Sequence, residues 1–167
     1  MDLIVSLNRA ELNYDVAMST HVISNREFAG GASEEQAWNY SNTEDKSGEF
    51  NLISRYLESA SNDLIGGLAM YMKEEYEFSD NILEETEVEE FMYVFDVPEN
   101  YNRSYLRPLR SKMHDYIVHR TLYRWFLQSK PDEADKHKAF AEELLEDSVS
   151  LLNKRNGLLK IRPYPHI

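Results

Sequence analysis

The sequence predicts a mainly α-helical protein, a four-helix up-down bundle-like domain with a long loop over residues 26–47 and a small β patch of two or three strands. Apolar residues recur three and four positions apart over long stretches, which is the period of one buried helix face. Glycine, proline and asparagine residues separate these stretches from one another. Residues 91–97 are β-prone, and their side chains alternate between two faces as in a strand. At 167 residues, one helical domain is expected over 1–167, with an N-terminal helix and loop over 1–48, a helical core over 49–156 and a docking tail over 157–167.

The N-terminal segment predicts a short strand followed by a helix. Residues 3–7 are mostly apolar, and Asn8 with Glu11 three positions later is typical of a capped helix start. We expect the helix to run from about Arg9 to Ser24. Its stripe of Leu12, Val16 and Ile23 is modest, which favours packing at the edge of the domain.

Residues 27–48 predict a long loop, because they contain a Gly-Gly pair and many Ser, Asn and Asp residues. Trp38 is the main apolar anchor in this segment. It suits either a contact with a partner or the fastening of the loop to its own core, and fastening is the default interpretation.

Residues 47–75 predict the most regular amphipathic helix of the chain. Its apolar positions are Phe50, Ile53, Leu57, Ala60, Leu64, Leu68 and Tyr71. The pair Gly66-Gly67 disfavours helix by about 1 kcal/mol per residue relative to alanine, so we expect it to allow close helix packing or a bend.

Residues 91–97 predict a strand in which Phe91, Tyr93, Phe95 and Val97 share one face. The strand needs a partner. Residues 3–7, residues 158–162 or the same strand of a neighbouring copy could each supply one, and pairing within the chain is the default.

The stretch from Ser104 to Ser129 predicts a long helix that forms the spine of the fold. Its expected stripe consists of Leu109, Met113, Tyr116, Ile117, Tyr123 and Leu127. Pro131, followed by two acidic residues, predicts the start of an antiparallel last helix, and Gly157 is placed to end it after about Asn156. The expected stripe of that helix is Phe140, Leu144, Leu145, Val149 and Leu152.

Charge is abundant and unevenly distributed. Eighteen basic and thirty acidic residues give a net charge of −12, which disfavours nonspecific binding to nucleic acid or anionic membrane. Residues 74–99 hold eleven acidic residues and no Lys or Arg, whereas residues 103–130 hold seven basic residues and one Asp. The acidic stretch could fold over its own basic helix or meet the basic helix or tail of another copy.

Catalytic and metal-binding patterns are absent from the sequence. His114 and His119 are five positions apart and do not share a helix face, the acidic pairs lack calcium-loop spacing, and no serine stands in a nucleophile motif. Arg120 and Arg124 fall near the buried stripe, and either could pair with a carboxylate of the acidic stretch or reach across to another subunit. We therefore expect no enzyme activity and no cofactor, and no stretch has the length of a membrane span.

Several short sequences in the second half form a packing signature. They are V-P-E-N-Y at 97–101, H-D-Y-I-V at 114–118, L-Y-R-W-F at 122–126 and S-K-P-D-E-A-D-K at 129–136, followed by a basic tail with two prolines. Over residues 91–165 the chain resembles small virion structural proteins of prophages in Bacteroides-type bacteria. More loosely, it is similar to the head-tail connector proteins that stack beneath the phage portal.

The resemblance implies a protein that acts by oligomeric assembly in the bacterial cytoplasm and then in the virion. Its partners would be further copies and portal or tail components, and DNA would pass through a ring without specific contacts. The interface residues we predict are Trp38, Phe91, Tyr93, Phe95, Leu158, Ile161, Tyr164 and Ile167. The alternative function is a cytosolic helical adaptor or regulator that binds one protein partner through the Trp38 loop or the acidic stretch.

Overall fold

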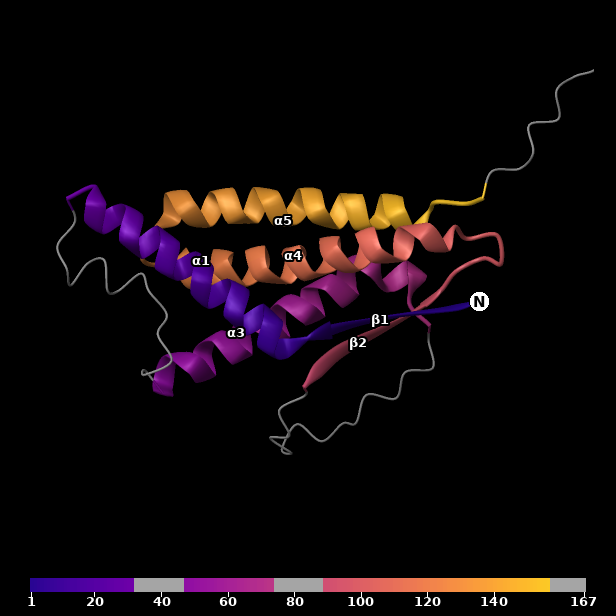
Figure 1. The fold of residues 1–167 in the computed structure, drawn as a ribbon, viewed down its shortest axis with the longest axis horizontal. Helices are drawn as coiled ribbons and strands as arrows, with labels where there is room; N and C mark the ends of the chain where they lie inside the picture. Colours follow the sequence, from indigo (N-terminus) through magenta and orange to yellow (C-terminus); the bar gives the residue numbers. More distant parts are fainter. Residues whose placement is uncertain (32–46, 74–88, 157–167) are drawn as a thin grey trace, which may run out of the picture.

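The computed structural model describes residues 1–31, 47–73 and 89–156, with side chains described from residue 52 onward in the second range. These residues form four helices and a two-stranded antiparallel sheet, so the predicted mainly α fold with a small β patch is confirmed (Figure 1). The elements are β1 (Asp2–Asn8), α1 (Arg9–Ala29), α3 (Ser47–Leu68), β2 (Glu90–Asp96), α4 (Leu106–Phe126) and α5 (Pro131–Leu152). Two short 3₁₀ turns cover Ala69–Tyr71 and Arg103–Tyr105.

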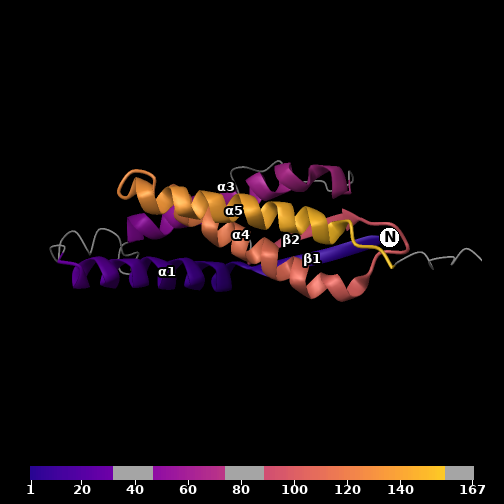
Figure 2. The same cartoon turned by 90° about the horizontal axis from the view of Figure 1, so that it is seen from above.

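α4 is the spine of this arrangement, as predicted, because the most extensive contact of each other helix, α1, α3 and α5, is with α4. Its most extensive contact is with α5, and α1 and α3 lie on opposite flanks of this pair (Figure 2). The buried side chains of α4 are Leu109, Met113, Tyr116, Ile117, Val118, Thr121, Leu122 and Phe126. Leu127, expected in the stripe, is instead 48% exposed, because the helix ends one residue earlier and Phe126 takes the buried position.

The sheet pairs the two predicted strands within the chain. β1 and β2 are antiparallel with Leu3 opposite Phe95 and Val5 opposite Tyr93, and all four of these side chains are buried. The amino group of Met1 closes this end of the sheet by donating to the carbonyl oxygen of Val97 at 2.8 Å. Residues 158–162, the third candidate strand, lie outside the described residues.

α1 begins as predicted and ends later than predicted. The Asn8 side-chain oxygen accepts hydrogen bonds from the backbone N–H groups of Ala10 and Glu11 at 2.8 and 3.1 Å. The helix then continues to Ala29, so the prediction of a loop from residue 26 is wrong at its start. Arg26 donates to Glu133 at 2.6 Å and Glu27 pairs with Lys130, and these contacts with the start of α5 stabilise the last turn.

α3 buries Ile53, Leu57, Ala60, Leu64 and Leu68, as its apolar period predicts. It ends at Leu68, before the predicted Glu75, because the chain turns to join the edge of the sheet. There the Lys73 N–H donates to the Val94 carbonyl at 3.1 Å. At Gly67 an added Cβ would lie 2.8 Å from both methyl groups of Leu145, which confirms the predicted close helix packing.

α5 begins at Pro131, and Asp132 and Glu133 lie in its first turn, as predicted. Its buried row is Glu133, Ala134, Ala141, Ser148 and Leu152, whereas Phe140 is 52% exposed and was wrongly placed in the buried stripe. Small side chains at the seam let α4 and α5 approach closely, and this leaves the Phe140 ring at the margin.

The end of α5 also differs from the expectation. The helix ends at Leu152, short of Asn156, because the following residues pair with the turn after β2. The Asn156 N–H donates to the Asn100 carbonyl at 2.8 Å, and the Arg155 guanidinium donates to the Leu152 carbonyl at 2.6 Å. Gly157, the expected cap, lies outside the described residues.

Candidate functional site: an exposed face of α1 and the groove beside it

The predicted interface residues of β2 face the chain's own core. Tyr93 and Phe95 are 1% and 0% exposed, and the Tyr93 hydroxyl lies 2.7 Å from the Ser61 hydroxyl of α3. Burial raises the pKa of Tyr93, so it stays a neutral hydrogen-bonding group. Phe91 is partly buried, with the Arg9 guanidinium 5.9 Å from its ring centre. These three side chains are therefore covered by their own fold.

The other five predicted interface residues are not placed. Trp38 in the loop and Leu158, Ile161, Tyr164 and Ile167 in the tail lie outside the described residues. Their roles stay predictions. The structure shows a further exposed surface, on α1, that was not predicted from the sequence.

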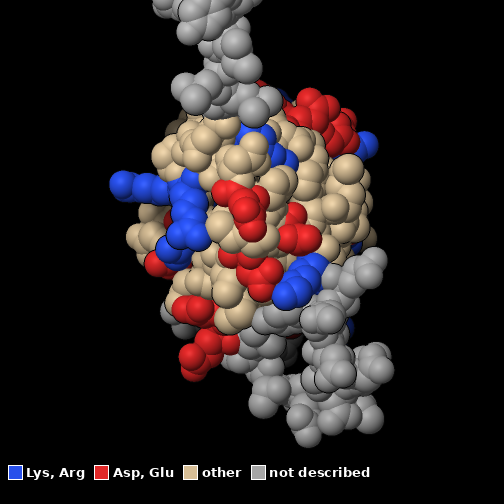
Figure 3. Space-filling model, turned by 90° about the vertical axis from the view of Figure 1, so that its right-hand side faces the viewer, with Lys and Arg blue, Asp and Glu red and all other residues tan. Residues whose placement is uncertain are grey.

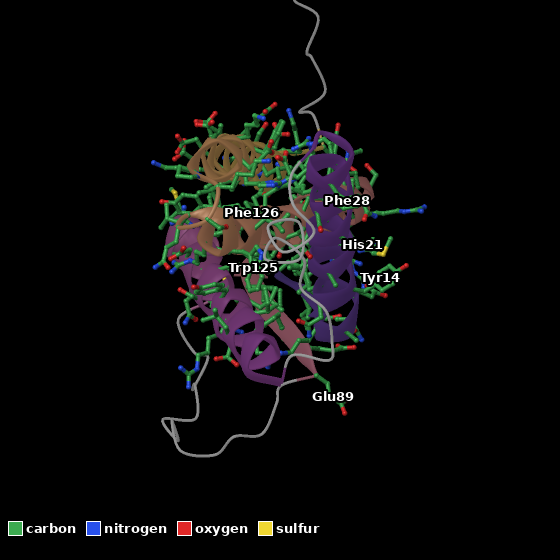
Figure 4. The ribbon with its side chains drawn as sticks, turned by 90° about the vertical axis from the view of Figure 1, so that its left-hand side faces the viewer. Tyr14, His21, Phe28, Glu89, Trp125 and Phe126 are labelled. Atoms are coloured by element: carbon green, nitrogen blue, oxygen red, sulfur yellow. The ribbon has the colours of Figure 1, made fainter. Side chains whose placement is uncertain are left out.

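α1 carries large apolar side chains on the face turned away from the core. Tyr14, Met18, Val22 and Phe28 are 64%, 44%, 61% and 57% exposed. Figure 4 shows Tyr14, His21 and Phe28 succeeding one another along the outer side of α1. A solvated helix face normally carries charged or polar residues, so a run of four large apolar side chains indicates a contact surface.

Six of the exposed residues of α1 are spaced regularly along the helix. Glu11, Tyr14, Met18, His21, Asn25 and Phe28 are separated by three, four, three, four and three positions, and all six are exposed. This is the a and d spacing of a coiled-coil seam. His21 and Asn25 within it are hydrogen-bonded at 3.0 Å. We call these six residues the α1 stripe.

A groove opens between the first halves of α1 and α4, at one end of the α1 stripe. Its volume is about 610 Å³. Its lining includes Glu11, Tyr14 and Asp15 of α1 and Arg107, Arg110 and His114 of α4. An Asp15 carboxylate oxygen lies 2.7 Å from Nε2 of His114, and this pair ties the two helices together at the groove floor.

Two arginines give the groove a positive rim. Arg107 and Arg110 are exposed, and neither forms an ion pair within the described ranges. On the end view of Figure 3, the largest group of Lys and Arg side chains lies at the left edge, smaller groups lie at the top, right and lower right, and acidic side chains occupy the centre. The groove therefore combines an apolar wall with charges of both signs, because Glu11 and Asp15 on the α1 side face the two arginines of α4 across it.

Other basic residues of α4 are used inside the fold. Arg120 Nε and an Arg124 Nη both donate to one oxygen of Asp63 in α3, at 2.7 and 2.9 Å. Burial alone would raise the pKa of Asp63, but the two guanidinium groups hold it below its ordinary value. Their partner among the described residues is therefore Asp63 of α3, whereas most of the acidic stretch, the partner considered from the sequence, lies outside the described residues.

His119 and His137 form a second polar contact, at the seam of α4 and α5. Their Nδ1 atoms are 2.9 Å apart, and the His137 ring stacks on Phe126 with centres 6.0 Å apart. Burial, with the neighbouring His119 as a further cause, lowers the pKa of His137 to about 4. His114 and His119 take separate partners, as their spacing predicts, and no group of three potential ligands suited to a metal ion occurs in residues 1–31, 47–73 and 89–156.

None of the helices in the described part of the chain is long and apolar enough to cross a membrane. Comparison with models of known protein families, with curated proteins and with solved structures found no match.

Proposed function

We propose that this protein is a structural assembly protein of a phage-like particle, of the head-tail connector or completion type. The observation that carries the proposal is the exposed apolar face of α1, which is a surface suited to a protein partner. The resemblance of residues 91–165 specifies the kind of assembly. In the structure, the described residues of that stretch include β2, α4 and α5, and α4 and α5 share the most extensive contact of the fold.

The proposed partners are further copies of the chain and portal or tail components. A net charge of −12 supports this choice, because a strongly acidic protein repels DNA phosphates and lets DNA slide past without binding. The protein would be made in the bacterial cytoplasm and then incorporated in the virion. Its contribution is positional, and we propose no catalytic step.

The proposal is tested by the composition of particles and by the position of the gene. Particles induced from a lysogen and purified on a density gradient should contain the chain in a fixed ratio to the portal protein. The flanking genes should encode portal, capsid or tail proteins. A chain that is absent from purified particles, with metabolic or regulatory genes on both sides, would instead favour the cytosolic adaptor.

A further inference from the structure

We infer that two copies of this chain pair antiparallel along their α1 stripes, with Phe28 of each copy seated in the groove between α1 and α4 of the other. The α1 stripe, the groove and the two arginines on its rim each point to this arrangement. It does not rest on a virion role, since an adaptor could use the same dimer.

The spacing of the α1 stripe selects a second α1 as its partner. Taking Tyr14, His21 and Phe28 as d positions makes Glu11, Met18 and Asn25 the a positions. In an antiparallel pair each a side chain meets a d side chain of the other helix. One register then fills every layer, with Glu11 opposite Phe28, Met18 opposite His21, and Asn25 opposite Tyr14 of the second copy. The pairing is self-complementary, as a two-fold contact requires.

The flanks of the stripe permit close approach. The positions beside the seam are Ala10, Ala17, Ser24, Asp15, Val22 and Ala29, of which only Asp15 is charged. Small flanking residues let two helices come near one another, and they place few like charges together despite the acidic net charge. Val22 adds a further exposed apolar side chain next to the seam.

The same register brings the end of one α1 to the groove of the other copy. Glu11 lines the groove, and Phe28 of the second copy stands opposite Glu11. Phe28 lies in the last turn of α1, at the negative end of the helix dipole. Arg107 and Arg110 on the groove rim supply the complementary positive charge. In this contact, the two arginines on the groove rim lie near the negative end of the second copy's α1, and the exposed ring of its Phe28 becomes buried.

A cysteine cross-linking experiment tests the register directly, because the natural chain has no cysteine. In the double variant Tyr14→Cys/Asn25→Cys, each cysteine should face the other type in the second copy. Mild oxidation should therefore give covalent dimers. The two positions are eleven residues apart, roughly 16 Å along the helix, so they cannot form a disulfide within one chain.

The single variants Tyr14→Cys and Asn25→Cys are the matched controls. Neither should cross-link, because identical residues lie far apart in the antiparallel register. Efficient cross-linking of the Asn25→Cys single variant would mean a parallel pair, and no dimer from the double variant would overturn the inference. Circular dichroism of each variant should match the wild type, which shows that any loss of cross-linking reflects the contact and not unfolding.

A charge reversal tests the groove separately. Arg110→Glu should weaken dimer formation about tenfold at low salt, and the effect should shrink at high salt. Arg55→Glu is the control, because Arg55 is an exposed arginine on α3, away from the groove. An equal effect of both variants would show that only net charge matters and would remove Arg110 from the contact.

Discussion

A few hydrogen bonds between ionisable side chains connect the helices of this protein. Asp63 is the clearest example, because one carboxylate oxygen accepts from both Arg120 and Arg124 and so ties α3 to α4. The three groups are about a quarter to a third exposed, which makes this a half-buried network and not a surface ion pair. Half-buried charged hydrogen bonds of this kind contribute more than exposed ones.

Replacing Asp63 with Asn should therefore destabilise the fold. The free energy of unfolding should fall by about 1–3 kcal/mol, because two guanidinium groups keep their burial and lose their charged partner. Urea denaturation followed by circular dichroism measures this. Asp135→Asn, on the exposed face of α5, is the control and should change stability by less than about 0.5 kcal/mol. Equal stability of the two variants would contradict the role of Asp63.

His137 should make stability depend on pH. Its folded-state pKa of about 4 lies below the ordinary value of 6.5, so the unfolded chain binds the proton more readily. The stability that His137 contributes should be full above pH 6.5, fall as the pH drops toward 4 and level off below. The melting temperature of His137→Gln should change less than that of the wild type between pH 6.5 and 4. The pKa of Glu133 is also lowered, so protonation of Glu133 should destabilise both proteins at more acidic pH. Parallel curves for the two proteins would contradict this assignment.

The helices and strands were predicted well where local chemistry decides the structure. The Asn8 cap, Pro131 at the start of α5 and the apolar period of α3 each act within a few residues. The errors lie where distant contacts decide. The last turn of α1 depends on Arg26 reaching Glu133, more than a hundred residues away. The groove is also formed by distant segments, because its two sides belong to α1 and α4. No local sequence pattern could therefore indicate it.

The glycine pair of α3 tests helix packing at the scale of an element. Gly66→Ala should stabilise the protein by about 0.5–1 kcal/mol, because nothing lies within 4 Å of the added methyl group and alanine favours helix. Gly67→Ala should gain less or lose stability, since its methyl group would force Leu145 of α5 to move. Denaturant unfolding measures both. Adding Leu145→Ala should reduce the difference between the two alanine variants, and an unchanged difference would contradict the packing argument.

At the scale of the whole molecule, one helix has an apolar face on each side. The inner face of α1, with Leu12, Val16 and Ile23, is buried against the domain, and the outer face carries the α1 stripe. Only the inner face is evident from the sequence, because polar residues such as His21 and Asn25 interrupt the outer one. The two faces of α1 differ in the exposure of their side chains in the folded chain, which is low on the inner face and high on the outer face. A protein with this surface is expected to self-associate, and this is the surface on which the proposed assembly function would depend.

Sedimentation equilibrium of wild-type protein and Met18→Glu over a range of concentrations tests this claim most directly. We expect the wild type to shift from monomer to dimer as concentration rises, whereas Met18→Glu stays a folded monomer, because a charge enters the centre of the seam. Met70→Glu is the matched control, since Met70 is 82% exposed on the turn after α3, and it should associate like the wild type. A wild type that stays monomeric at every concentration, or a Met18→Glu variant that associates equally well, would contradict the claim that the outer face of α1 is a contact surface.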